Sequence, residues 1–259
     1  MNLKSKILKQ LKPYSWWIQN TLTRKESKKN RNILNKADKI LFEIEKKKDK
    51  KQYQVLKKKF ESLKMERKNY TSVESKNLNE SDIEKIEKFF DYFIELTVYK
   101  ELENRGFKNI QFLPESKTKT PDIMACFNGK YYYIEVKNIR KSKKERNALW
   151  KGKEGENLAN KILPRNFADN FESFKTKVKN GIKKKIESCI KDANEKFKNV
   201  EKSNIEIKKI LVINYIEGYE VWCIERRDNL RNLRGVLGND YFNKLEKENK
   251  ISIWTRKYL

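Results

Sequence analysis

Two acidic residues and a lysine could act together from one face of a predicted β-hairpin. Asn128-Gly129 is the dipeptide most typical of a two-residue hairpin turn, and it lies between two apolar segments. This turn sets a register in which Asp122 lies opposite Glu135, with Cβ atoms about 4.5–5.5 Å apart. Because side chains alternate along a strand, Lys137 shares the face of Glu135. The hairpin therefore presents two carboxylates and an amine together.

The chemistry of such a group follows from charge. Two neighbouring carboxylates repel each other, so a positive group between Asp122 and Glu135 is expected. Lys137 could supply it, but a divalent cation does so better, because one or two carboxylates suit Mg²⁺. Mg²⁺ polarises phosphoryl oxygens and acidifies water, and Lys137 could orient that water. The opposite face of the hairpin is apolar and predicted to be buried: Ile123, Ala125, Phe127, Ile134 and Val136.

The composition excludes most other chemistry. The 259 residues include no histidine, so neither Ser-His-Asp nor Cys-His catalysis nor a Cys2His2 zinc site can form. The three cysteines are too far apart for a CxxC pair, which favours reduced thiols in the cytoplasm. No GxxxxGK[ST] motif is present. With 62 Lys and Arg against 36 Asp and Glu, the net charge of +26 indicates a polyanionic partner, nucleic acid before membrane.

The motif around the hairpin resembles a known nuclease signature. The chain has T-P-D-I-M-A at 120–125 and I-E-V-K at 134–137, with twelve residues between Asp122 and Glu135. This arrangement is similar to the PD-(D/E)xK pattern. Pro121-Asp122 supplies the PD, and 135–137 supply the (D/E)xK. The resemblance covers residues 81–216 and is closest to archaeal Holliday-junction resolvases and restriction-type nucleases.

The resemblance implies a restriction-endonuclease-like fold, an α/β core with a mixed central sheet flanked by helices, and an acidic residue on the helix before the hairpin. By the family pattern this residue is Glu95, and Glu101 is the alternative. The implied metal ligands are Asp122, Glu135, Glu95 and a backbone carbonyl such as that of Val136, with Lys137 assisting the nucleophile. The implied cofactor is Mg²⁺, for which Mn²⁺ substitutes. The implied reaction is hydrolysis of DNA, preferred over RNA, in restriction or phage defence, mobile-element processing or junction resolution.

Two domains are expected, a basic helical N-terminal arm at 1–80 and a nuclease domain at 81–259. Apolar residues recur at helical spacing within 25–68, which predicts one long helix or a helical hairpin. The arm is expected either to present a solvated helical surface or to contact a nucleic-acid backbone. In the second domain the pattern predicts helices at 81–105, 167–198 and 228–247, and strands at 107–113, 205–216, 219–225 and 251–256, besides the hairpin.

Basic and aromatic residues around the hairpin are candidates for nucleic-acid contact. The segment after the second strand is basic, and its predicted phosphate-binding residues are Asn138, Arg140, Lys141, Lys143 and Lys144. Tyr131 and Tyr133 share the face of Glu135, where they either stack on bases or pack beneath a helix.

Other properties bound the prediction further. No apolar run approaches the roughly 18 residues of a membrane span, so no membrane partner and a cytoplasmic location are expected. Two cuts in a duplex would favour a homodimer by symmetry, whereas a nickase needs only one subunit. The rival hypothesis is a non-catalytic basic protein that binds nucleic acid through the same fold.

Overall fold

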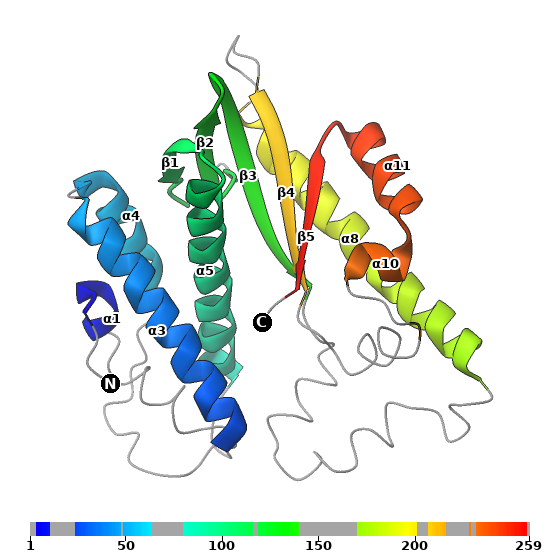
Figure 1. The fold of residues 1–259 in the computed structure, drawn as a ribbon, viewed down its shortest axis with the longest axis horizontal. Helices are drawn as coiled ribbons and strands as arrows, with labels where there is room; N and C mark the ends of the chain where they lie inside the picture. The colour runs from blue at the N-terminus through cyan, green and yellow to red at the C-terminus, as the bar shows by residue number, and fades with distance from the viewer. Residues whose placement is uncertain are drawn as a thin grey trace. The chain divides into compact units, whose positions relative to one another are not determined.

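The computed structural model describes residues 4–10, 24–47, 49–63, 80–115, 119–139, 170–200, 207–215, 228 and 232–257. The predicted strand at 219–225 lies outside these residues. Helices and strands follow in the order α1 Lys6–Gln10, α3 Arg24–Lys46, α4 Lys50–Glu61, α5 Glu80–Asn104, β1 Lys108–Phe112, β2 Ile123–Phe127, β3 Lys130–Ile139, α8 Phe171–Lys198, β4 Ile207–Tyr215, α10 Leu233–Leu237, α11 Asn239–Asn249 and β5 Ser252–Lys257 (Figure 1).

The five strands form one mixed sheet in the order β1-β2-β3-β4-β5. β1 is antiparallel to β2, and β4 is parallel to both β3 and β5. The predicted α/β class, with a mixed sheet and flanking helices, is therefore confirmed. The chain divides into two compact units. Unit 1 is Met1–Pro114 with Ile123–Phe127, and unit 2 is Glu115–Asp122 with Asn128–Leu259. A boundary near residue 80 stays a prediction.

Unit 1 begins with helices whose buried positions repeat every three or four residues. On α3 these include Ile33, Ala37 and Ile44, as the spacing predicts. The helical region does not continue as one rod, because Asp49 caps a new helix: its side chain accepts from the N–H of Gln52 at 3.0 Å. Of the two alternatives for 25–68, the structure has two helices, α3 and α4.

A buried amide joins α4 to the first strand of unit 1. Gln52 accepts from the main-chain N–H of Phe112 at 2.7 Å and donates to its carbonyl at 3.4 Å. Helix α5 packs against α3, α4, β1 and β2. Helix α5 ends at Asn104, and Gly106 with φ +85° follows it, a backbone conformation that glycine commonly supplies just after a helix.

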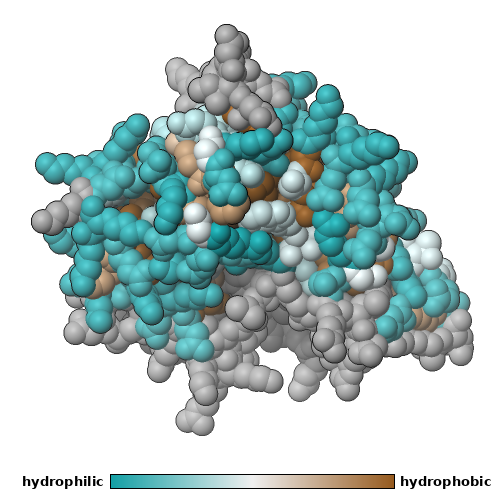
Figure 2. Space-filling model, turned by 45° about the horizontal axis from the view of Figure 1, so that its top comes forward, coloured by the Kyte–Doolittle hydropathy of each residue, from teal (hydrophilic) through white to brown (hydrophobic). Residues whose placement is uncertain are grey.

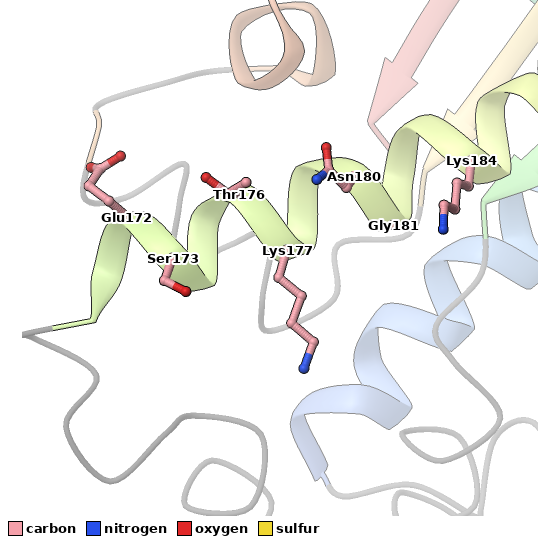
Figure 3. A pocket seen from close by; sticks show the side chains of 7 residues that line it. All are labelled: Glu172, Ser173, Thr176, Lys177, Asn180, Gly181 and Lys184. Carbon is pink, nitrogen blue, oxygen red and sulfur yellow. The ribbon is translucent and has the colours of Figure 1, made fainter.

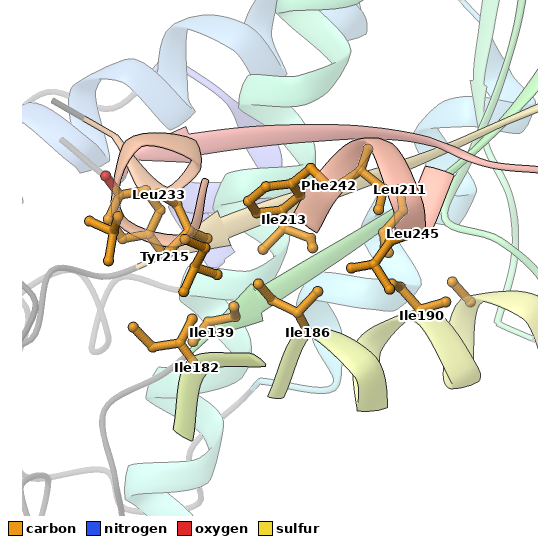
Figure 4. Close-up of a cluster of buried hydrophobic side chains, with 14 of the residues drawn as sticks. Ile139, Ile182, Ile186, Ile190, Leu211, Ile213, Tyr215, Leu233, Phe242 and Leu245 are labelled. Atoms are coloured by element: carbon orange, nitrogen blue, oxygen red, sulfur yellow. The ribbon is translucent and has the colours of Figure 1, made fainter. Parts of the chain in front are cut away.

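The described part of unit 2 contains the parallel strands β3, β4 and β5 and the helices α8, α10 and α11. Helix α8 packs on β3 and β4, while α10 and α11 pack on β5. Aliphatic and aromatic side chains of these elements point toward one another in a shared core (Figure 4). The core includes Ile139, Ile182, Ile186, Ile190, Leu211, Ile213, Tyr215, Leu233, Phe242 and Leu245. The hairpin turn also forms as predicted, since Asn128 and Gly129 have φ of +48° and +73°.

The single helix predicted over 228–247 is wrong. The structure has two helices there, α10 and α11, because Gly238 has φ +89° and ψ 144°, which interrupts the helix. Asn232 caps α10 by accepting from the N–H of Gly235 at 2.8 Å. The apolar residues of both helices face the unit 2 core, which is why their periodicity was indistinguishable from that of one helix.

None of the helices in the described part of the chain combines the length and the apolar character needed to cross a membrane.

Two glycines give a matched test of this backbone. Gly238→Ala is expected to destabilise the protein by about 1–3 kcal/mol, because its φ and ψ are nearly exclusive to glycine. Gly181→Ala, inside α8 where an added Cβ meets no atom within 4 Å, is expected to stabilise it by about 0.4–1 kcal/mol. Thermal unfolding followed by circular dichroism measures both. Equal effects of the two substitutions would contradict the assigned backbone conformations.

Candidate active site

Asp122 is held by main-chain hydrogen bonds immediately before β2. Its N–H donates to the carbonyl of Ile134 at 3.1 Å, and its carboxylate Oδ2 accepts from the N–H of Val136 at 2.8 Å. Pro121, directly before it, is buried. The fixed backbone and the bond to Oδ2 leave Oδ1 as the oxygen that other groups can reach.

Glu135 is almost fully buried, with 1 % of its surface exposed. It lies on β3 between Tyr133 and Ile139, which alternate onto the same side and pack against the core formed with α8. The sequence left open whether this face of the hairpin lines a cleft or packs beneath a helix. In the structure α8 covers it, because the chain returns through that helix to reach the parallel strand β4.

A residue that sequence reasoning missed links the two acids. Lys196, near the end of α8, places Nζ 2.6 Å from Oε1 of Glu135 and 3.5 Å from Oδ1 of Asp122. Its side chain is 20 % exposed. The available signal was its position on α8, three residues after the buried Ala193 and one before the buried Phe197, at the edge of the apolar stripe.

Lys137 forms the outer side of the same group. Its Nζ lies 3.3 Å from Oε1 of Glu135 and 3.6 Å from Oδ2 of Asp192 on α8. Three carboxylates and two ammonium groups therefore meet, and we call Asp122, Glu135, Lys137, Asp192 and Lys196 the diacid site. All five residues belong to unit 2.

The end of α8 also holds the segment that carries Asp122. The side-chain amide of Asn199 donates to the carbonyl of Lys119 at 2.7 Å, and Lys119 pairs with Glu195 at 2.9 Å. One helix end thus positions Lys196 and the chain leading into Asp122.

Burial dominates the electrostatics of the site. Burial, and then the charge of Asp122, raise the pKa of Glu135 from its ordinary 4.5 to about 8, although Lys196 and Lys137 act in the opposite direction. Burial lowers the pKa of Lys196, but the charges of Asp122 and Glu135 outweigh burial, so that pKa is raised. The glutamate therefore takes up a proton readily, while the lysine stays charged.

The oxygens of the site suit a small divalent cation. Oε2 of Glu135 has no hydrogen-bond partner among the described residues, while Oε1 lies at ion-pair distance from Lys196 and Lys137. With Oδ1 of Asp122, these are hard oxygen donors of the kind Mg²⁺ binds through one or two carboxylates and several waters. No group of three or more acidic, cysteine or histidine side chains among the described residues is arranged to hold a metal ion. A cation bound by two carboxylates alone would keep much of its water.

The other predicted acids have partners elsewhere. Glu95 is buried in unit 1, where its carboxylate accepts from Lys59 at 2.6 Å, and Lys59 lies 5.4 Å from the ring centroid of Tyr92. Glu101, the alternative on the same helix, pairs with Arg105 at 2.7 Å. Both carboxylates are thus engaged by cations within unit 1.

The predicted nucleic-acid contacts separate into three groups. Tyr131 is 39 % exposed, whereas Tyr133 packs against the unit 2 core, which favours packing beneath a helix for that residue. Asn138 alternates onto the face of β3 opposite Glu135 and pairs in register with Asn214 of β4. The remaining four lie outside the described residues: Arg140, Lys141, Lys143 and Lys144.

An open hollow lies along the solvent-exposed side of the N-terminal half of α8, which we call the outer side of this helix. Its described lining residues all come from this helix: Glu172, Ser173, Thr176, Lys177, Asn180, Gly181 and Lys184 (Figure 3). The side chains of Lys177 and Lys184 point to the same side of the helix. Hydroxyl, amide and ammonium groups of this kind contact phosphates in nucleic-acid complexes.

No protein-family model, no curated protein and no solved structure matches this chain.

The raised pKa of Glu135 gives a signed prediction for stability. Between about pH 4.5 and pH 8 the folded protein holds a proton that the unfolded chain has released, so its free energy of unfolding falls as the pH rises through this window. The loss is on the order of a few kcal/mol. Glu135→Gln should remove this part of the pH dependence. Urea unfolding at pH 5, 6, 7 and 8 measures it.

Glu248→Gln, on the exposed side of α11, is the matched control and should keep the wild-type slope. A Glu135→Gln protein with the same pH dependence as the wild type would show that Glu135 does not take up that proton.

Proposed function

We propose that this protein is a Mg²⁺-dependent endonuclease of the PD-(D/E)xK type that hydrolyses phosphodiester bonds in DNA. The observation that carries the proposal is the meeting of Asp122 and Glu135 at one cation, the ammonium of Lys196, with Lys137 beside them. These acids and Lys137 are the residues that the motif singles out, although they lie on either side of the hairpin turn.

Each acid offers one oxygen to a metal. Val136 holds Oδ2 of Asp122 and so directs Oδ1 toward the centre of the site, while Oε2 of the buried Glu135 has no hydrogen-bond partner among the described residues. Mg²⁺ bound by these oxygens, or Mn²⁺ in its place, would polarise a phosphoryl oxygen and supply an acidified water. A carbonyl such as that of Val136 is the proposed third ligand, and Glu95 stays a proposed ligand of a second metal or of a water.

Lys137 is the proposed partner of the attacking water. Its amine lies 3.3 Å from Glu135 and keeps some contact with solvent, while Asp192 holds it from the other side. In this position the ammonium can orient a water or stabilise negative charge on a phosphate.

The order of the elements also supports the proposal. A long helix, α5, precedes β1, β2 and β3, and α8 then leads to β4 in a mixed sheet. This agrees with the restriction-endonuclease-like arrangement that the motif implies, in which a helix lies ahead of the hairpin.

Charge supports nucleic acid as the substrate. The chain has a net charge of +26, and α8 carries six lysines and no acid between Ser173 and Ile186. Hydrophilic residues, in teal, make up most of the coloured surface in Figure 2. We propose DNA over RNA, in restriction or phage defence, mobile-element processing or junction resolution, and a homodimer if both strands are cut.

A second candidate function is non-catalytic binding of nucleic acid. The observation that favours it is Lys196, whose ammonium already balances the acids that a metal would need. Cleavage assays separate the two candidates.

Removal of Asp122 or Lys137 from the diacid site should abolish cleavage and spare binding. Asp122→Ala and Lys137→Ala are each expected to lower the cleavage rate by at least about 10²–10³-fold, because charge stabilisation at the phosphate is lost. The assay uses plasmid, linear, single-stranded and branched DNA and an RNA, with Mg²⁺ or with EDTA. Asp240→Ala, in the exposed first turn of α11, is the control.

Cleavage by the Asp122→Ala protein at the wild-type rate would end the nuclease proposal. Salt-sensitive binding with no cleavage of any substrate in Mg²⁺ would favour the non-catalytic candidate instead.

The outer side of α8 is the proposed backbone contact. The double substitution of Lys177 and Lys184 by alanine should weaken DNA binding and reduce the slope of log K against log salt by about 1.8, if each lysine neutralises one phosphate. Fluorescence anisotropy with a labelled duplex in EDTA measures the slope. The same change at Lys244 and Lys247 of α11 is the charge-matched control, and an equal loss there would contradict a specific contact on α8.

A further inference from the structure

The ammonium of Lys196 lies where a cation shared by the two acids would lie. Its Nζ is 2.6 Å from Glu135 and 3.5 Å from Asp122, and it reaches them from α8 rather than from the hairpin. Neighbouring lysines on the same helix, Lys191 and Lys198, are exposed. The inward position is therefore particular to Lys196 and does not follow from the abundance of lysine.

This ion pair balances charge but leaves one oxygen of the buried carboxylate without a partner. Oε1 of Glu135 lies 2.6 Å from the ammonium of Lys196 and 3.3 Å from that of Lys137, whereas Oε2 has no hydrogen-bond partner among the described residues. A buried ion pair stabilises a fold well only when its remaining lone pairs are also satisfied. The oxygen without a partner, Oε2 of Glu135, is therefore available to a divalent cation, which needs several oxygen ligands.

The helix offers Lys196 another partner if it leaves the acids. Asp192 lies four residues earlier on α8, and its side chain is 53 % exposed. An acidic residue four positions before a lysine forms a favourable ion pair on a helix surface. The lysine can thus move outward without losing ionic compensation.

We infer that Lys196 competes with a divalent cation for Asp122 and Glu135, so that metal binding requires this ammonium to leave the diacid site. The inference rests on the proposed function, because it takes the same two acids as metal ligands. The inference assigns to α8 the control of metal affinity. While α8 holds Lys196 inward, the site binds no metal, and when Lys196 moves outward, the metal can bind.

Mn²⁺ binding without nucleic acid tests the inference directly. Free Mn²⁺ is measured by electron paramagnetic resonance during titration of the wild type, Lys196→Met, Lys196→Arg, Lys191→Met and Asp122→Asn. Lys196→Met should bind Mn²⁺ about tenfold or more tightly, because a like charge within a few ångströms of the metal is removed. Lys196→Arg should stay near the wild type, since it keeps the charge. Lys191→Met, with the same change in net charge on an exposed position, should stay within about twofold of the wild type.

The outcomes distinguish failure of the inference from failure of the proposed function. Lys196→Met binding no tighter than Lys191→Met would overturn the inference, and loss of Mn²⁺ binding in Asp122→Asn would at the same time keep the proposed metal site. Mn²⁺ binding by no variant, including Lys196→Met, would overturn both. Circular dichroism checks folding, and Lys196→Gln replaces Lys196→Met if the latter does not fold.

Discussion

A carboxylate buried beneath a helix must be neutralised, and in this protein that requirement shapes everything around Glu135. Its strand places it among side chains that pack into the unit 2 core, so it cannot turn to solvent. Lys196 from the covering helix and Lys137, two residues along the strand, both lie at ion-pair distance from this carboxylate. The pKa of Glu135 is also raised, so the carboxylate tends to hold a proton. The same helix end anchors the segment that carries the other acid.

Local patterns in the sequence were sufficient for much of the fold. Asn128-Gly129 fixes a turn through positive φ values that these residues tolerate, and strand alternation then groups Glu135 with Lys137. Apolar spacing likewise located α3, α5 and α8, because one face of each helix must be buried. The break at Gly238 escaped this reasoning, since two short helices that pack on one core show the same periodicity as a single helix.

The rest of the site depends on contacts between elements far apart in the chain. Lys196 is one of nine lysines on α8, and its place at the edge of the apolar stripe does not by itself show that it reaches the acids. Its role follows from how α8 docks on β3, a tertiary contact that spacing does not encode. For the same reason Tyr133 could not be assigned to a cleft or to the core until the helix was in place.

The parallel pairing of β3 with β4 has a consequence for how this protein folds. The hairpin can form early, because its contacts are local, but β4 and the helix before it must close a long loop to reach β3. Until that closure the glutamate is solvated and ionised, and the lysine that later meets it is far away along the chain. A nascent chain that ends before α8 therefore carries two hydrated acids and none of their later environment.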